Sequence, residues 1–207
     1  VEISENEELD RVIPIIEEIK KKFDIFISID SKKPKVLDHA IKAGAVIAND
    51  ISMLENEEII EIIIKHQVHY VLGHFRKNSS HKNVVPEVLS DLSKKIDILT
   101  ESGFDRRKII LDPGIGFGKK FKESKDIFAN IDIIKKSFNL PIMVGTSRKS
   151  FIGEYTKKEI DNRLFGTAST IAFGILNGAN ILRVHDHKEM IDVKKMTQVL
   201  KDSRYRV

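Results

Sequence analysis

Cysteine is absent from this chain of 207 residues, and several chemistries are excluded with it. Disulfide bonds, thiolate nucleophiles and cysteine-ligated zinc cannot form. No apolar run approaches the roughly 20 residues that a membrane-spanning helix needs. The acidic start of the chain also lacks the basic region and apolar centre of a signal peptide. We therefore expect a soluble, cytoplasmic protein that makes no membrane contact.

A large net charge is lacking too, because 35 basic and 31 acidic residues leave a net charge of +4. The charges are interspersed as Lys/Glu pairs along the predicted helices, a pattern typical of solvated helix faces. No basic stripe with interleaved aromatic residues is present, so we expect no nucleic-acid partner. Cations gathered around one pocket would instead suit an anionic small molecule.

Short apolar blocks alternate with helical patterns along the whole chain. Strands are predicted at residues 24–30, 45–51, 68–72, 108–111, 140–145 and 180–184. Helices are predicted at about residues 5–22, 34–42, 57–65, 84–102, 122–138, 161–176 and 188–202, with a mobile loop at 77–83. The alternation predicts an α/β fold with a parallel sheet in one domain. Six βα units would suit an open doubly wound sheet, whereas a closed (β/α)₈ barrel requires eight.

The stretch from Lys108 to Lys120 combines a buried strand with an acid, a proline and alternating glycines. Asp112 would stand at the carboxyl end of the strand, and Gly116 would let the next loop pass close to a ligand. Lys119 would add a cation at the rim. The same residues are equally compatible with a simple turn. The glycine spacing matches neither a P-loop nor the dinucleotide-binding fingerprint.

Polar residues follow every predicted strand. In a (β/α)₈ barrel such strand ends converge on one face, where catalytic groups are found. They are Asp30, Asn49, Asp50, His74, Arg76, Asp112, Ser147, Arg148, Lys149, Arg183 and His185. Six successive strand ends of this kind are hard to explain by turn chemistry alone.

The types of these side chains indicate a ligand. Asp30, Asn49 and Asp112 supply oxygen acceptors suited to an N–H-rich edge such as an aminopyrimidinone ring. The last two strand ends supply donors suited to carbonyl and phosphate oxygens. The sequence thus predicts a pocket for a heterocycle that carries an anionic tail.

Five segments, in this order, resemble those of the dihydropteroate synthase family. They are residues 28–34, 47–51, 112–119, 147–153 and 183–186. The resemblance covers nearly the whole chain and implies a (β/α)₈ TIM barrel. It also implies a reaction in folate biosynthesis, which joins 6-hydroxymethyl-7,8-dihydropterin pyrophosphate to p-aminobenzoate and releases pyrophosphate. Mg²⁺, bound mainly through the substrate pyrophosphate, and a homodimer are implied as well.

The resemblance assigns roles at the pterin end of the site. Asp30, Asn49 and Asp112 would hold the pterin edge, and Lys149 would face its carbonyl and ring nitrogen. Gly116 would keep the loop slim beside the flat ring.

At the other end, the resemblance implies that Arg183 stacks on the pterin and, with His185, faces the pyrophosphate. Phe117 and Ser150 would help bind p-aminobenzoate. Lys149, Arg183 and His185 are then the predicted catalytic residues. No protein nucleophile and no metal ligand within this chain are expected.

The chain departs from the family pattern in two places. Gly73-His74-Phe75 stands where the family has Met-His-Met, so the apolar wall of the pterin pocket is altered. The first two βα units of the family have no counterpart, and only the last six are visible. We therefore expect a single pterin-binding barrel domain over residues 1–207 that is incomplete at its N-terminus, with apolar strand edges open at residues 24–30 and 180–184.

Two alternatives remain open from the sequence. One is a pterin-binding barrel of the methyltransferase type, which would use a similar set of Asp and Asn side chains. The other is a catalytically inactive truncated barrel. Saturable p-aminobenzoate or sulfonamide binding in the presence of pyrophosphate would distinguish the synthase from the methyltransferase.

Overall fold

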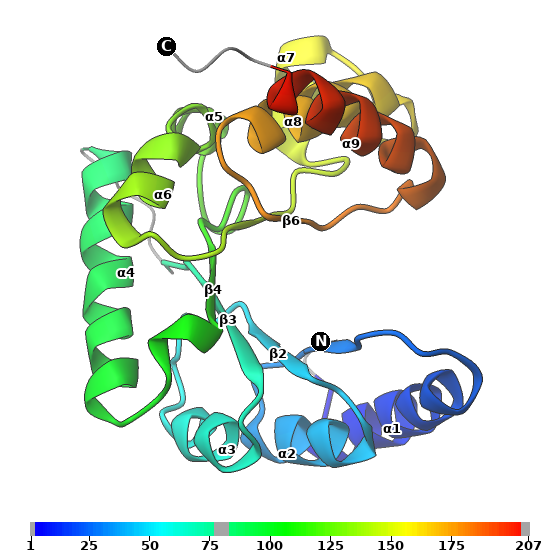
Figure 1. The fold of residues 1–207 in the computed structure, drawn as a ribbon, viewed down its shortest axis with the longest axis vertical. Coiled ribbons are helices and arrows are strands. Elements are labelled where there is room, and N and C mark those ends of the chain that lie inside the picture. Colours follow the sequence, from blue (N-terminus) through cyan, green and yellow to red (C-terminus); the bar gives the residue numbers. More distant parts are fainter. Residues whose placement is uncertain (1–2, 77–82, 204–207) are drawn as a thin grey trace. The chain divides into compact units, whose positions relative to one another are not determined.

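The computed structural model describes residues 3–76 and 83–203 (Figure 1). The chain divides into two compact units, of which unit 1 comprises Val1–His74 and Asp91–Ile110, and unit 2 comprises Phe75–Ser90 and Leu111–Val207. Two of the crossings between the units fall inside the helix α4 (Val84–Glu101) and the strand β4 (Ile109–Asp112). The predicted loop at 77–83 lies, apart from residue 83, outside the described residues.

Unit 1 is built on parallel strands. Its complete strands are β1 (Ser28–Asp30), β2 (Ile47–Asp50) and β3 (His69–Gly73), in a sheet of order β1-β2-β3-β4. Its helices are α1 (Glu5–Lys22), α2 (Pro34–Ala43), α3 (Glu58–His66), the second part of α4 and the 3₁₀ turn η1 (Arg106–Lys108). The apolar blocks of β2 and β3 are buried, as expected for strands that are covered on both faces.

Local signals explain where the first helices begin and end. Ser4 caps α1, because its hydroxyl accepts the backbone N–H of Glu7 at 3.2 Å. Gly44 ends α2 with φ of +122°, a conformation that favours glycine. Ser31 does not cap α2. Its hydroxyl accepts the N–H of Lys33, which is itself the residue before the helix.

The first strand is shorter than predicted. Only residues 28–30 pair with β2, and residues 23–27 form no regular element. The side chain of Phe26 is 86% exposed. The strand lies at the edge of its sheet, where the apolar residues before it have no neighbouring strand among the described residues.

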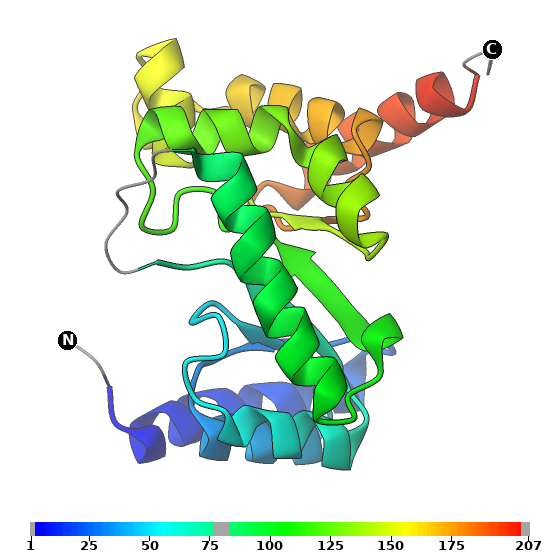
Figure 2. The same cartoon turned by 90° about the vertical axis from the view of Figure 1, so that its left-hand side faces the viewer.

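Unit 2 continues the parallel arrangement. Leu111 forms a parallel bridge with Ile142, and β5 (Met143–Val144) pairs with β6 (Ile181–Leu182). The helices are α5 (Phe121–Ala129), α6 (Ile131–Phe138), α7 (Ser150–Thr156), α8 (Leu164–Leu176) and α9 (His187–Asp202), with a 3₁₀ turn η2 (Ile160–Asn162). Ile171, Ile175 and Met190 form a buried cluster between α8 and α9, which run side by side in Figures 1 and 2.

Two helix predictions for unit 2 are corrected by the structure. The helix predicted at 122–138 is two helices, because Asn130 leaves helical geometry and its side-chain amide donates to the carbonyl of Asp126. The helix predicted from Asp161 begins at Leu164, and the short helix α7 before it was not predicted. Among the helices of the described ranges, none is long and apolar enough to cross a bilayer.

Candidate active site

A cavity of about 360 Å³ lies within unit 2, at the carboxyl ends of β4, β5 and β6. Its lining residues are Asp112, Phe117, Gly145, Ser147, Lys149, Arg183, Val184 and His185. Five of the nine predicted site residues are therefore brought together here. They come from three strand ends, as the convergence of parallel strands requires.

Asp112 is the single acidic side chain of this cavity, and it is 4% exposed. Burial raises the pKa of Asp112, while the N–H of Gly114 and the charges of Lys149, Lys119 and Arg183 act in the opposite direction. Its Oδ1 accepts that N–H at 2.8 Å. A ligand with paired N–H donors would therefore stabilise the ionised form of this carboxylate.

Lys149 and Phe117 contact each other in the cavity. The ammonium nitrogen of Lys149 lies 3.8 Å from the centre of the Phe117 ring, a cation–π arrangement. Burial lowers the pKa of Lys149, and Asp112 partly opposes the shift. A Cβ on Gly116, where φ is +80°, would come within 3.1 Å of the Lys149 Cδ. The glycine therefore leaves room for this lysine, consistent with the predicted slim loop.

The sequence position of Lys119 suggested a cation at the rim, but the structure does not place it there. Its ammonium group turns back under the loop and donates to the carbonyls of Gly114 (2.8 Å) and Phe117 (3.1 Å). Burial lowers the pKa of Lys119 to about 8, although the carboxylate of Asp112 favours the charged form. Lys119 is a half-buried brace of the loop, a role that spacing alone does not reveal.

His185 reaches the cavity on the loop after β6 and is held by Ser147. The Ser147 hydroxyl oxygen lies 3.0 Å from Nδ1 of His185 and accepts its backbone N–H at 3.3 Å. Beside this pair, the guanidinium of Arg148 donates to both carboxylate oxygens of Asp186. This ion pair raises the pKa of Arg148 and lowers that of Asp186.

Four predicted site residues do not line this cavity: Gly116, whose place beside Lys149 is given above, and Asp30, Asn49 and Ser150. Asp30 and Asn49 belong to unit 1, where they are direct partners across β1 and β2. Asn49 is 4% exposed, and its Oδ1 has no hydrogen-bond partner in the part of the chain that the structure describes. Ser150 is the exposed first residue of α7. Their substrate contacts remain predictions.

Other strand-end residues are engaged within their own units. Asp50 accepts the N–H of Leu54 at 2.9 Å and the hydroxyl of Tyr70 at 2.7 Å, so it supports the turn after β2. His74 is buried and lies 3.1 Å from a carboxylate oxygen of Asp91. These residues follow the strand-end pattern, but the contacts described here support the fold.

The donor set does not fit a metal ion held by the protein alone. Over residues 3–76 and 83–203, no three His, Asp or Glu side chains come close enough to hold a metal. The cavity has one carboxylate surrounded by cations. Mg²⁺ prefers several oxygen ligands in an octahedral arrangement, which these residues do not supply.

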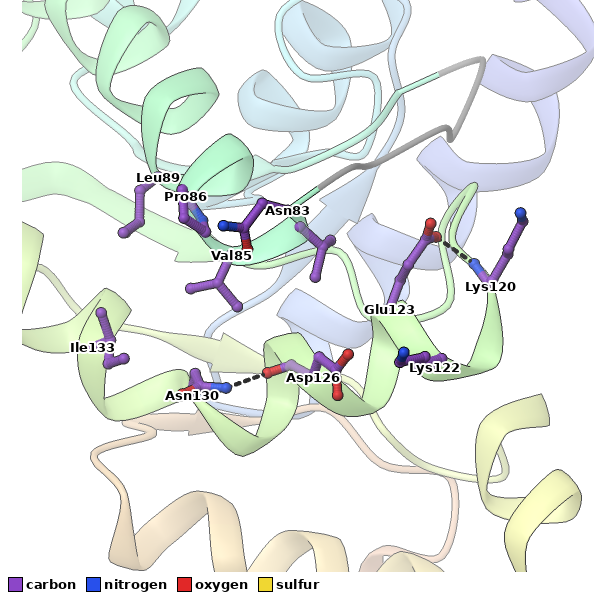
Figure 3. A pocket seen from close by; sticks show the side chains of 11 residues that line it. Asn83, Val85, Pro86, Leu89, Lys120, Lys122, Glu123, Asp126, Asn130 and Ile133 are labelled. Atoms are coloured by element: carbon purple, nitrogen blue, oxygen red, sulfur yellow. Dashed lines mark hydrogen bonds between the residues drawn. The ribbon is translucent and has the colours of Figure 1, made fainter.

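A larger cavity, of about 600 Å³, lies elsewhere in unit 2, beside the first turn of α4 and along α5 and α6 (Figure 3). Its charged residues, Lys120, Lys122, Glu123 and Asp126, are all partly or fully exposed. One of them, Glu123, accepts the backbone N–H of Lys120. Because it gathers no buried polar group, this cavity is a weaker candidate than the one around Asp112.

Comparison with known proteins places this geometry in a family. The sequence profile described as "Pterin binding enzyme" matches residues 1–185. Dihydropteroate synthase of Clostridium beijerinckii is 40% identical over 96% of this chain and 74% of its own length. The corresponding values for the Bacillus subtilis enzyme are 38%, 96% and 70%.

Solved structures agree with the sequence comparison. Dihydropteroate synthase of Xanthomonas albilineans with 4-aminobenzoic acid superposes with a TM-score of 0.94 and 31% identity, over 99% of this chain and 75% of the other. The match confirms the predicted fold class, a (β/α)₈ TIM barrel of which six βα units are seen here. By sequence and by structure, this chain belongs to the dihydropteroate synthases of the pterin-binding enzyme family.

Proposed function

We propose that this chain condenses 6-hydroxymethyl-7,8-dihydropterin pyrophosphate with p-aminobenzoate, forming 7,8-dihydropteroate and pyrophosphate. The observation that carries this proposal is the cavity in which one buried carboxylate, Asp112, is surrounded by Lys149, Arg183 and His185. Such a site matches a substrate with an N–H-rich ring at one end and a polyanion at the other. Relatives with 4-aminobenzoic acid and with 7,8-dihydropteroate bound support the same reaction.

Asp112 and Lys149 hold the ring in this proposal. The buried carboxylate accepts N–H donors of the aminopyrimidinone edge, and these replace the hydration that burial removed. Lys149 donates to the ring carbonyl and nitrogen. Asp30 and Asn49 extend the set of acceptors, and the buried Oδ1 of Asn49 is suited to an amine donor.

Arg183 and His185 act where charge develops. The carbon–oxygen bond between the pterin methylene and the pyrophosphate breaks, and its electron pair leaves with the pyrophosphate. Cationic and N–H donors stabilise that negative charge. The arylamine nitrogen of p-aminobenzoate then bonds to the methylene and loses a proton. No covalent bond to the protein forms.

The second substrate binds at the loop mouth. Phe117 offers an apolar face to the p-aminobenzoate ring, and Ser150 offers a hydroxyl to its carboxylate. Mg²⁺ accompanies the pyrophosphate as part of the substrate, since the cavity's own donor set does not hold it. We further propose a homodimer, a cytoplasmic location and a single pterin-binding domain over residues 1–207.

Pyrophosphate release from the two substrates tests the proposal. Asp112→Asn should weaken pterin binding about a hundredfold, because a charged acceptor is lost from a buried site. The matched control is Asp132→Asn, a half-exposed carboxylate of α6 that is paired with Lys136. A wild-type protein that releases no pyrophosphate, or an Asp112→Asn variant that binds pterin normally, would contradict the proposal.

A further inference from the structure

The loops after β5 and β6 are joined by two side-chain contacts that the proposed reaction does not use. The hydroxyl of Ser147 contacts both the ring and the backbone N–H of His185. One residue further along each loop, Arg148 forms a two-pronged ion pair with Asp186. Two successive residues of one loop therefore hold two successive residues of the other.

The loop after β5 is itself held by hydrogen bonds to the backbone of Arg148. Arg148 has φ of +56°, a region that residues with a Cβ seldom adopt. Its N–H donates to the buried hydroxyl oxygen of Thr167 at 3.1 Å, and its carbonyl accepts from Arg163 at 2.9 Å. Contacts that over-determine such a backbone hold it in place. They keep Ser147 in its position beside His185.

We propose that Ser147 is a positioning residue that selects the tautomer of His185. Its side chain is 5% exposed, and its oxygen already accepts the His185 backbone N–H. Among the described residues the hydroxyl has no other acceptor for its proton, which is therefore assigned to Nδ1, and the neutral ring then carries its own proton on Nε2.

This tautomer matters for an anionic ligand. Nδ1 is engaged by Ser147, so Nε2 is the ring nitrogen left for a ligand in the cavity that His185 lines. An Nε2–H group donates to a pyrophosphate oxygen, whereas a bare lone pair on Nε2 would repel it. The role of this tautomer in binding pyrophosphate rests on the proposed function, but the assignment of the tautomer does not.

Nitrogen-15 NMR of the histidine rings tests the inference without substrate. At a pH where the ring is neutral, the wild-type His185 should show protonated Nε2 and unprotonated Nδ1, with His185→Gln identifying the signals. Ser147→Ala should shift the ring to a tautomer mixture, and Ser147→Thr should restore the wild-type pattern. Ser169→Ala removes an exposed serine hydroxyl of α8 and should change nothing.

Kinetics and binding give the second readout. Ser147→Ala should lower kcat/KM for the pterin substrate and the affinity for inorganic pyrophosphate about tenfold each, with the KM for p-aminobenzoate unchanged. A wild-type spectrum with the proton on Nδ1 overturns the inference even if Ser147→Ala does not fold. So does a Ser147→Ala variant with unchanged tautomer and pyrophosphate affinity. Absent turnover in the wild type would refute the proposed function alone, because the NMR result does not depend on turnover.

Discussion

Among the single side chains, Lys119 shows how much a sequence position can mislead. A lysine after three glycines suggests an exposed cation, yet this side chain is half-buried and its ammonium group donates to two carbonyls. The residues that line the cavity, by contrast, could be predicted, because strand ends of a parallel sheet converge whatever the details of packing. Asp112, Phe117, Lys149, Arg183 and His185 belong to that group. Contacts such as Ser147 to His185 depend on loop conformation, which no spacing encodes.

Lys119 should make stability depend on alkaline pH. Its pKa is about 8 in the folded chain and about 10.4 when unfolded, so between these values the unfolded chain binds more protons. The free energy of unfolding should therefore rise with pH from about 8 to 10, by up to about 3 kcal/mol. Urea denaturation of the wild type and of Lys119→Met at several pH values measures the difference.

The control for this titration is Lys136→Met, which removes an exposed lysine paired with Asp132. It should leave the alkaline rise intact, while Lys119→Met abolishes it. Equal pH profiles for the wild type and Lys119→Met would show that Lys119 keeps an ordinary pKa.

At the scale of elements, the strand–helix alternation was predictable, and the interruptions were not. Apolar blocks identified all six strands because a buried parallel strand has no polar face. The break between α5 and α6 was missed because Asn130 is tolerated within helical patterns, and only its bond to the Asp126 carbonyl reveals the end of α5. The first strand was predicted too long because the apolar residues before Ser28 continue the strand pattern, although only residues 28–30 pair with β2.

The turn after β2 depends on one buried carboxylate. Met53 and Leu54 have φ of +64° and +57°, and Asp50 holds this strained turn by accepting four hydrogen bonds. Tyr70→Phe removes one of them and should lower the free energy of unfolding by about 1–2 kcal/mol. Urea denaturation measures this loss.

Tyr155→Phe serves as the control, since that ring is exposed on α7. It should cost less than about 0.5 kcal/mol. Asp50→Asn should cost more than Tyr70→Phe, because an amide cannot accept on both of its ends. If Tyr70→Phe were as stable as the wild type, Asp50 would not depend on this hydroxyl.

For the whole molecule, two of the three crossings between the units fall inside regular elements and not in a linker. The chain passes between them inside α4 and inside β4, so melting one unit removes part of a helix and part of a strand from the other. We therefore expect a single cooperative unfolding transition, consistent with the proposed single domain.

Fluorotyrosine NMR can measure this prediction, because Tyr70 lies in unit 1 and Tyr155 in unit 2. Both native signals should disappear at the same urea concentration. Separate midpoints for the two signals would show that the units unfold independently and would argue against a single domain.

The Lys119 brace also bears on how this enzyme can diversify. Its two acceptors are main-chain carbonyls, which every amino acid possesses, so the loop keeps its shape whichever side chain stands at position 117. Natural variation or directed evolution can therefore exchange the ring of Phe117 without rebuilding the loop. In the proposed site, where Phe117 faces p-aminobenzoate, selectivity among aromatic amines and their analogues should be adjustable by substitutions at position 117 while the fold is left intact.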